Sequence, residues 1–472
     1  MPDSDSDSSN EGFQVRVALK LASTVENRSL EVPTEPIAVP ADIGRKGLSA
    51  VVNHLLGRSV GDNDDSDNDS KSDADEEDDD KAQLNFEFIV SGTNNRLLRK
   101  GVEREARQHG ISLEEAIPIT YFPASNVPDL SEEKEELPDW VSSLSSSGSL
   151  LFSGCYDGTV HVYRNDQQAL KEVHSVTVSS GPIKCLDTTV HKDQTWVATA
   201  SLDHTLSIHT CDSKGKSMQA FGECIHEGFS CTTSSLNFCS APSQLLASGG
   251  GNGTICLWDV TNAGNDGTDA APKKRKTSSG KKSLLAQIRP TAVLQSAHSQ
   301  LVSGVSWGNH SKDNATTLIS GSWDHSIKLW DVERQDCLLT LNGSRVVACL
   351  DTSYHSEGVV ATGHPDCTIR LWDVRTNQSN QSSVVSDKTF RPSHKAWVSC
   401  VQWSQTNAFH LVSSSHDGTV KLWDIRSSNP LHTVKVFGKE EKGLCLNYQA
   451  SAEDGPKVFV GGSDCSIKCI SF

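Results

Sequence analysis

The feature that most constrains the fold is a pattern that recurs seven times in the C-terminal two-thirds of the sequence. Each copy has a short apolar strand, small residues, a tight turn and a second strand that ends in Trp-Asp or a variant. The turn residues are Asp157, Asp203, Asn252, Asp324, Asp366, Asp417 and Asp464. Their spacings are 46, 49, 72, 42, 51 and 47 residues, against about 40–45 residues for one four-stranded blade. The repeat therefore predicts an all-β, seven-bladed propeller over residues 138–472.

Each copy also carries the residues that a blade needs. Val420 and Leu422 alternate with polar residues opposite Leu411, which predicts strands buried between neighbouring blades. In WD-repeat proteins, a His, a Ser, an Asp and a Trp of one blade form a hydrogen-bonded tetrad. The tetrad positions are His298, Ser320, Asp324 and Trp330 in the fourth copy, and His394, Ser413, Asp417 and Trp423 in the sixth. Other copies lack the upstream His or the turn Asp, so we expect incomplete tetrads there.

Two motifs resemble catalytic sites. The Ser, His and Asp of a tetrad could form a hydrolase triad, but the set recurs from copy to copy, whereas an active site occurs once. The run Gly249–Gly253 is rich in glycine like a phosphate-binding loop, but it lies between two strands and opens no helix. We find no nucleotide loop, metal-ligand cluster or isolated nucleophile–base pair. We therefore expect a protein that is not an enzyme, with no cofactor, no intrinsic metal and no small-molecule substrate.

Composition argues against a zinc-binding or disulfide-rich protein, and against a membrane or secreted one. The 14 cysteines are scattered, and none falls in a Cys-x-x-Cys pair. This distribution favours free, buried thiols over zinc ligands or a disulfide framework. No stretch approaches the ~20 apolar residues that span a bilayer, and the acidic N-terminus is the opposite of a secretory signal peptide. We expect no membrane association.

A smaller folded unit is predicted before the repeats, over residues 13–123. Phe13, Val15, Val17, Leu19 and Leu21 alternate at period two, as in a half-buried strand. We expect strands over 13–21, 30–39, 86–90 and 117–122, a helix from Leu48 to a C-cap at Gly57, and a helical turn or short helix within 94–109 before Gly110. The order ββαβ(α)β predicts an α+β ubiquitin-like β-grasp.

Residues 124–137 are expected to link the two units. The last repeat reaches Phe472 after its third strand, so ring closure requires an outer strand from before the first repeat. The segment 117–124 cannot serve fully as both the last β-grasp strand and the closing strand. We assign it to the β-grasp and leave closure to residues 124–137, because a closed ring leaves no open sheet edge.

The formal charge of −17 is concentrated in one segment. Residues 62–80 contain twelve acidic residues and one lysine, which accounts for −11 of it. Such a block cannot bury apolar surface and repels itself, so we expect disorder over residues 61–83 and over the acidic residues 1–12. The remainder is only mildly acidic, which does not favour broad binding to a phosphate backbone.

The 72-residue spacing contains an insert at residues 261–290. It includes the basic run Lys273, Lys274, Arg275 and Lys276. A short basic run in a long exposed loop is typical of a nuclear localisation signal. The alternatives are a solvated charge run or a contact with RNA phosphates. We favour the import signal, because the rest of the chain is not basic.

The N-terminal unit resembles the NLE (Notchless-like) domain, a ubiquitin-like fold. The segments VPADIGRKGLSAVVNHLLG (39–57) and GISLEEAIPITY (110–121) carry the resemblance. An NLE domain before seven WD repeats is similar in plan to the WD repeat-containing protein twelve, or Ytm, family of ribosome biogenesis proteins. Notchless itself has a similar plan but usually carries eight repeats, so a Notchless-like pre-60S factor is the nearest alternative. The long acidic insert departs from the family pattern.

This resemblance implies a nucleolar and nucleoplasmic function in the nucleus. Family members join pescadillo and the block-of-proliferation protein in the PeBoW complex, which is needed for 60S subunit maturation and for processing of 5.8S/28S pre-rRNA. The AAA ATPase midasin later removes the protein from pre-60S particles. An acidic residue of the NLE domain then completes the metal coordination of midasin's MIDAS domain, and the matching residue is Glu114. The alternative is that Glu114 and Glu115 are ordinary solvated acids before a strand.

A second class of function stays open at this point. WD propellers also act as nuclear adaptors, for example as substrate receptors of ubiquitin ligases. No feature of the sequence requires this function. Because a fold does not specify its partners, the partners that co-purify would separate the two classes: pescadillo and pre-60S rRNA, or a cullin adaptor.

Overall fold

The chain forms two compact units, residues 1–126 and 127–472. The computed structural model describes residues 14–23, 25, 27–58, 84–93, 96–166, 169–191, 194–224, 232–239, 245–260, 286–308, 317–356, 358–375, 388–391, 393–450 and 455–471. The acidic N-terminus (1–12), the acidic insert (61–83) and most of the basic insert (261–285) lie outside the described residues. The expected disorder of the two acidic segments therefore stays a prediction.

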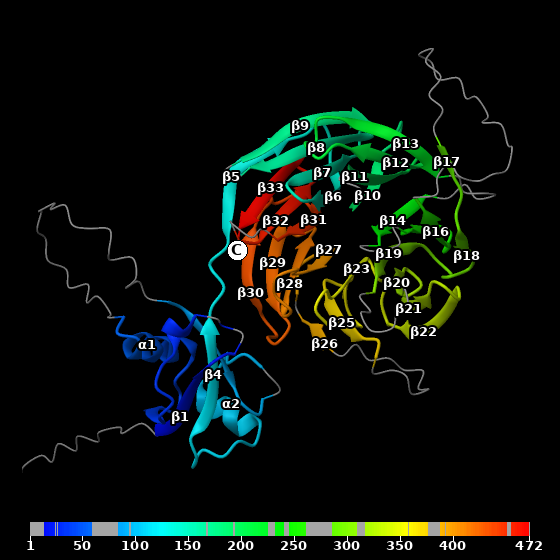
Figure 1. The fold of residues 1–472 in the computed structure, drawn as a ribbon. Coiled ribbons are helices and arrows are strands. Elements are labelled where there is room, and N and C mark those ends of the chain that lie inside the picture. Colours follow the sequence, from blue (N-terminus) through cyan, green and yellow to red (C-terminus); the bar gives the residue numbers. More distant parts are fainter. Residues whose placement is uncertain are drawn as a thin grey trace, which may run out of the picture. The chain divides into compact units, whose positions relative to one another are not determined.

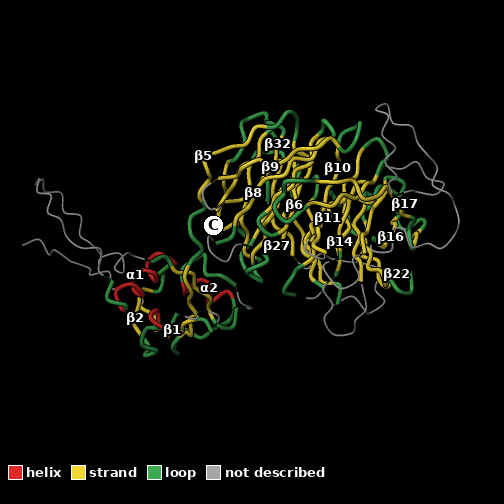
Figure 2. The backbone as a smooth tube through the Cα atoms, turned by 45° about the horizontal axis from the view of Figure 1, so that its top comes forward, coloured by secondary structure: helices red, strands yellow, loops and turns green. Residues whose placement is uncertain are grey.

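The N-terminal unit is a four-stranded mixed sheet with two helices among its described residues. Its elements are β1 (Gln14–Leu21), the 3₁₀ helix η1 (Arg28–Leu30), β2 (Ile37–Pro40), α1 (Arg45–Leu55), β3 (Phe86–Val90), α2 (Val102–Gln108) and β4 (Ile117–Pro123). The strand order is β2-β1-β4-β3, with β1 and β4 parallel and both outer pairs antiparallel. This arrangement confirms the ubiquitin-like fold. Among the described residues, both helices of the chain belong to this unit (Figure 2).

Period-two alternation in β1 builds the core of this unit. Val15, Val17 and Leu19 are buried, whereas Gln14, Arg16 and Lys20 face solvent. Leu48 and Val52 of α1 pack on the same side, and both are completely buried. The apolar alternation and the helical spacing therefore identify the buried face correctly; Phe13 lies outside the described residues.

Two element boundaries differ from the prediction. The second strand begins at Ile37 rather than at Leu30, because Pro33 and Pro36 have no N–H to donate to a strand ladder. The helix begins at Arg45, before the first apolar residue of the pattern, and ends where expected. Gly57 has φ +71°, its N–H donates to His54 O at 3.1 Å, and Arg58 N–H donates to Asn53 O at 2.9 Å. These bonds form the Schellman motif that ends many helices.

The C-terminal unit contains seven antiparallel sheets of four strands, one of which gains a fifth strand. Blade one has β6 (Val141–Ser147), β7 (Leu150–Cys155), β8 (Thr159–Asp166) and β9 (Ala169–Thr177); blade two has β10 (Ile183–His191), β11 (Gln194–Ser201), β12 (Leu206–Cys211), β13 (Met218–Cys224) and β17 (Ala286–Ile288); blade three has β14 (Thr233–Phe238), β15 (Leu245–Gly250), β16 (Ile255–Asp259) and β18 (Ala292–Leu294). Blade four has β19 (Val302–Trp307), β20 (Thr317–Ser322), β21 (Ser326–Asp331) and β22 (Asp336–Asn342); blade five has β23 (Cys349–Thr352), β24 (Val359–Gly363), β25 (Ile369–Asp373) and β26 (Lys388–Phe390). Blade six has β27 (Val398–Trp403), β28 (His410–Ser415), β29 (Thr419–Asp424) and β30 (Pro430–Lys435); blade seven has β31 (Gly443–Gln449), β32 (Lys457–Gly462), β33 (Ser466–Ser471) and β5 (Asp129–Glu136).

The seven sheets form a closed ring, which confirms the seven-bladed propeller (Figure 1). The first strand of each blade lies innermost and contacts the first strands of both neighbouring blades. In order around the ring, these inner strands are β6, β10, β14, β19, β23, β27 and β31, and β31 contacts β6 again. Apolar side chains between neighbouring blades form the core, and Trp258, Trp403 and Trp423 are among its largest fully buried side chains.

Strand β5 closes the ring as the outer strand of blade seven. It pairs antiparallel with β33, which matches Leu130 with Ile470, and Leu137 N–H donates to Cys465 O at 2.7 Å. Figure 1 shows β5 in cyan beside β33 in red. The closing strand lies within residues 124–137, as predicted from the sequence. The expected linker is therefore largely a strand of the propeller, and the compact propeller unit begins at Val127 rather than at residue 138.

Candidate interaction surfaces and structural hydrogen-bond networks

Blade four brings the four predicted tetrad residues together. His298 lies in the loop before β19, Ser320 on β20, Asp324 in the turn that follows, and Trp330 on β21. Trp330 Nε1 donates a hydrogen bond to Ser320 Oγ at 2.8 Å. His298 lies between Ser320 and Asp324, with Nε2 2.8 Å from Ser320 Oγ and Nδ1 3.0 Å from Asp324 Oδ2. One chain of hydrogen bonds thus joins the turn to the interior of the blade.

Blade six repeats the same arrangement. Trp423 Nε1 donates to Ser413 Oγ at 2.9 Å. His394 Nε2 lies 2.8 Å from Ser413 Oγ, and His394 Nδ1 lies 3.2 Å from Asp417 Oδ2. In both blades, a Thr or Ser two residues after the turn Asp also bonds the Asp carboxylate, as Thr419 Oγ1 does at 2.6 Å.

The charges and the burial of the tetrads favour a structural role. Burial lowers the pKa of His298 and of His394, so each imidazole is neutral and can donate Nδ1–H to its Asp while Nε2 accepts the Ser hydroxyl. Burial alone would raise the pKa of Asp324, but hydrogen bonds from Ser326 and Ser299 outweigh it and hold the pKa at about 2. Ser320 is completely buried, so no substrate reaches its hydroxyl.

Other blades contain parts of the tetrad. In blade three, Trp258 Nε1 donates to Ser248 Oγ at 2.9 Å, and Asn252 in the turn accepts from Thr254. In blade five, Trp372 Nε1 donates to Thr362 Oγ1, which lies 2.8 Å from His364 Nε2. His364 directly follows β24. It takes the place of the His that precedes the inner strand in blades four and six and that blade five lacks. Sequence reasoning missed it because it searched only the upstream position.

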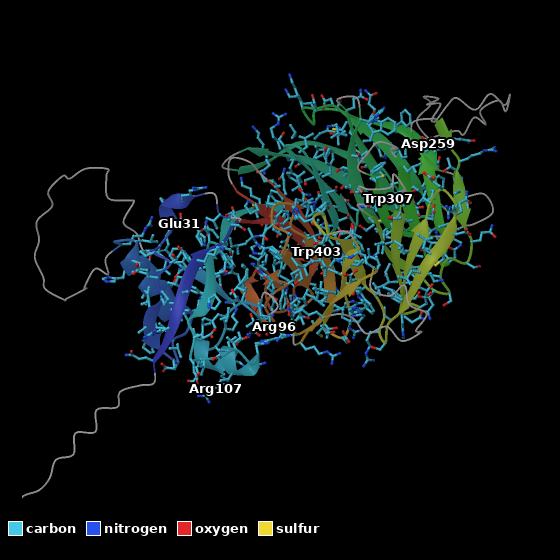
Figure 3. The ribbon with its side chains drawn as sticks, turned by 60° about the horizontal axis from the view of Figure 1, so that its bottom comes forward. Glu31, Arg96, Arg107, Asp259, Trp307 and Trp403 are labelled. Atoms are coloured by element: carbon cyan, nitrogen blue, oxygen red, sulfur yellow. The ribbon has the colours of Figure 1, made fainter. Side chains whose placement is uncertain are left out.

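Sequence reasoning also missed a ring of polar residues on the seven inner strands. The ring positions, matched through strand register, are Ser145, Asp187, Asn237, Ser306, Asp351, Gln402 and Asn447. Four of them accept a backbone N–H from the next blade: Asp187 from Phe238 (2.7 Å), Asn237 from Trp307 (3.2 Å), Asp351 from Trp403 (2.8 Å) and Gln402 from Tyr448 (2.7 Å). Trp307 and Trp403 lie inside the propeller (Figure 3). The ring thus satisfies N–H groups of inner strands, which are sheet edges.

The two acids of this ring have unusual protonation behaviour. Burial raises the pKa of Asp187 to about 6 and that of Asp351 to about 7, and the charge of Asp187 contributes to the rise at Asp351. Hydrogen bonds from the next blade oppose the rise without cancelling it. Both carboxyl groups therefore titrate much closer to neutrality than an ordinary Asp.

Glu114 lies in the N-terminal unit, on the loop between α2 and β4. Its side chain is exposed, as is that of Glu115, and its backbone N–H donates to Ser112 Oγ at 3.3 Å. On the same loop, Ile111 and Leu113 are partly buried and pack against the core. The loop is therefore anchored by apolar contacts, and it presents the Glu114 carboxylate to solvent.

Comparison with known proteins identifies both units. Residues 17–102 match the NLE (NUC135) domain family, and residues 134–164, 170–210, 222–259, 289–331, 335–373 and 386–424 match the WD domain, G-beta repeat family. A ribosome biogenesis protein WDR12 homolog of Oryza sativa subsp. japonica is 31% identical, and the match covers 94% of this chain and 93% of the relative. The chain belongs to the WDR12 family of ribosome biogenesis proteins. WDR12 homologs of Chlamydomonas reinhardtii and Nematostella vectensis are 30% and 29% identical over 93% of this chain.

The structure adds two points to the WDR12 family match. The repeat matches end at residue 424, and the propeller contains a seventh blade beyond it, in which Ile470 stands where blades three to six have Trp. The NLE match ends at residue 102, so Glu114 lies beyond it and its role stays a prediction.

The remaining sequence predictions concern parts of this WDR12-family chain that are only partly described. Lys273, Lys274, Arg275 and Lys276 lie outside the described residues. The insert that contains them returns to the propeller at β17, which pairs in parallel with β13 of blade two, so its two ends are attached to blades three and two. Over the described residues, no group of three or more His, Cys, Asp or Glu could hold a metal ion. No helix within these residues is long and apolar enough to cross a membrane.

Proposed function

We propose that the chain is a non-catalytic scaffold for maturation of the 60S ribosomal subunit, located in the nucleolus and nucleoplasm. The observation that carries this proposal is the near full-length match to WDR12 homologs, whose name states a function in ribosome biogenesis. The hydrogen-bond networks agree with a scaffold, because each of the two complete tetrads uses its Ser, His and Asp groups to join the turn to the strands within one blade.

The proposed partners are pescadillo and a block-of-proliferation-type protein, in a PeBoW-type complex on pre-60S particles. In this complex the chain supports processing of 5.8S/28S pre-rRNA. A propeller suits such a role because its rigid ring presents loops from seven blades, and binding residues are commonly carried on loops held by a rigid scaffold.

We further propose that midasin removes the chain from the particle through the NLE domain. Glu114 is the residue proposed to complete the metal coordination of midasin's MIDAS domain. A carboxylate is a hard oxygen ligand that suits Mg²⁺. The exposed position of Glu114 on an anchored loop supports this role, since a ligand supplied in trans must reach a partner without unfolding its own domain.

The basic run at Lys273–Lys276 is proposed as the nuclear localisation signal. A reporter protein fused to residues 261–290 should enter the nucleus. The matched fusion, with Lys273, Lys274, Arg275 and Lys276 replaced by Ala, should remain in the cytosol. Equal distribution of the two fusions would refute the signal.

Co-purification tests the proposed function against the adaptor alternative. The tagged full-length chain should recover pescadillo, the block-of-proliferation-type protein and pre-60S rRNA. A ubiquitin-ligase substrate receptor would instead recover a cullin adaptor. Recovery of a cullin adaptor without rRNA precursors would overturn the proposal.

A further inference from the structure

A repeated hydrogen bond defines one face of the propeller. In six blades, the residue before the turn residue donates its backbone N–H to the residue before the inner strand. The donor–acceptor pairs are Tyr156–Trp140, Leu202–Pro182, Gly251–Thr232, Trp323–Leu301, His416–Trp397 and Ser463–Lys442, all at 2.8–3.0 Å. In blade five the donor position is Pro365, which has no N–H to donate. We call the surface that these positions form the turn face.

Exposed apolar surface is concentrated on the turn face. Over the described residues, eight large hydrophobic side chains are exposed, and four of them (Trp140, Leu202, Trp323 and Trp397) occupy these positions. The rings of Trp323 and Trp397 lie 6.4 Å apart, although they come from blades four and six, and Trp397 also contacts His416 at 5.8 Å. Exposed aromatic residues that contact one another in this way are characteristic of protein-binding sites.

Three lysines give this sector of the turn face a positive charge. Lys395 precedes Trp397 by two residues, Lys442 belongs to blade seven, and Lys184 belongs to blade two; all three side chains are exposed. None of the three forms an ion pair with another residue of the described chain. Asp417, the turn acid of blade six, is already bonded to His394 and to the backbone N–H of Lys395. The ammonium groups are therefore available to an external anion.

The charges of Lys184 and Lys442 both affect His416, which belongs to the cluster of contacting rings formed by Trp323, Trp397 and His416. Burial and the charge of Lys442 lower the pKa of His416, which contacts Trp397; the charge of Asp417 opposes this change, and that of Lys184 adds to it. Lys184 occupies the bulge position of inner strand β10. The equivalent residues of four other inner strands are Ser142, Ser234, Ser303 and Ser399, at the same bulge. A cation at this position is thus a feature of blade two alone among those five blades.

We propose that the sector of the turn face formed by Trp323, Trp397 and His416 with Lys184, Lys395 and Lys442 binds an acidic peptide segment that carries large apolar side chains. The contacting indoles would receive the apolar side chain, and the lysines would pair with the carboxylates around it. This surface belongs to the propeller, whereas Glu114 belongs to the N-terminal unit, and the proposal does not depend on the proposed release by midasin.

Two observations favour a peptide over single-stranded RNA as the occupant. Trp323 and Trp397 are tilted by 46° and contact each other, so they leave no slot in which a base could stack between them. A short peptide can pair its few carboxylates with the three lysines alone, whereas a polynucleotide backbone would also extend over the rest of a chain that, apart from the −11 of residues 62–80, carries a formal charge of −6.

Selection from a displayed library of random 12-residue peptides on the full-length chain tests the proposal. The recovered peptides should be enriched in Asp and Glu together with Leu, Ile or Phe. Their affinity for the double variant Trp323→Ala/Trp397→Ala should fall by about thirtyfold. Their affinity for the triple variant Lys184→Glu/Lys395→Glu/Lys442→Glu should fall by about tenfold or more. Their affinity for the wild type should decrease as the salt concentration rises. Because the lysine side chains are exposed, the triple variant should keep the thermal midpoint of the wild type, and the double Trp variant should still unfold cooperatively.

Trp140→Ala is the matched control. Trp140 is an exposed indole on the same face, but it makes an edge contact with Tyr156 of blade one and lies next to Asp139 rather than next to lysines. The recovered peptides should bind this variant with wild-type affinity. Recovery of neutral or basic peptides, equal binding by all variants, or the same loss for Trp140→Ala would overturn the proposal. It would also be overturned if a 12-nucleotide oligouridylate bound the wild type more tightly than the peptides did and lost affinity with Trp323→Ala/Trp397→Ala.

Discussion

Asp351 of β23 accepts the backbone N–H of Trp403 on β27 at 2.8 Å, across the junction between blades five and six. The bond makes a buried carboxyl group part of the contact between neighbouring blades. Asp187 makes the same kind of bond to Phe238 between blades two and three, at 2.7 Å. The contacts between blades therefore depend on polar groups at the inner strands as well as on apolar packing.

The raised pKa of Asp351 predicts a pH-dependent stability. Between pH ~4 and the folded-state pKa of about 7, the folded chain keeps a proton that the unfolded chain releases. The free energy of unfolding therefore falls as pH rises through this range. Asp351→Asn stays neutral and keeps one acceptor oxygen, so it should reduce the loss of stability between pH 5 and pH 8 by about 1 kcal/mol.

Urea unfolding of the full-length chain at the two pH values measures this effect. Asp336→Asn, at an exposed position on the outer strand β22, is the matched control and should leave the pH dependence unchanged. An identical pH dependence in wild type and Asp351→Asn would contradict the prediction. It would show that Asp351 ionises in the folded chain with little loss of stability.

Removal of the central hydroxyl of a tetrad should destabilise the propeller. Ser413→Ala leaves the buried Trp423 N–H and His394 Nε2 without their partner. An unsatisfied buried polar group costs about 1–3 kcal/mol, so the free energy of unfolding should fall by about 2 kcal/mol or more. Ser428→Ala, at an exposed position of the same blade, should change it by less than about 0.5 kcal/mol. Equal effects in chemical denaturation would contradict the structural role of the tetrad.

Ring closure by β5 predicts where the chain can be shortened. A fragment over residues 127–472 keeps the closing strand and should unfold cooperatively. A fragment over residues 138–472 lacks β5, which exposes the edge of β33 and the apolar side chain of Ile470. Unpaired strand edges favour aggregation, so this fragment should form soluble aggregates in size-exclusion chromatography. Monomeric, equally stable fragments would mean that the ring does not need β5.

Periodic features of the fold can be predicted from the sequence. The Trp-Asp repeats predict the blade number, and the alternation of Val15, Val17 and Leu19 predicts the buried face of β1, because both signals come from many residues with one spacing. The two tetrads are predicted for the same reason: His, Ser, Asp and Trp occur at matching offsets in blades four and six. The structure brings both sets together.

Features without a fixed spacing escape sequence reasoning. The polar ring residue precedes the turn residue by 12 positions in blade one (Ser145 to Asp157) and by 18 in blade four (Ser306 to Asp324). The length of the connection between the first two strands varies, so strand register reveals the ring and sequence spacing does not. The face shared by Trp323 and Trp397 also requires the structure, since 74 positions separate them in the chain.

The central claim is that the chain is a platform removed from pre-60S particles through Glu114, and release by midasin tests it most directly. Glu114→Gln keeps the shape of the exposed side chain but removes the charge that a metal requires, so it should leave stability within about 0.5 kcal/mol of wild type. Glu115→Gln, at the neighbouring exposed position, is the matched control. Purified pre-60S particles carrying each variant are incubated with midasin and ATP, and the fraction of the chain that is released is measured. The account predicts that Glu114→Gln stays bound while Glu115→Gln and wild type are released; release of Glu114→Gln at the wild-type level would contradict it.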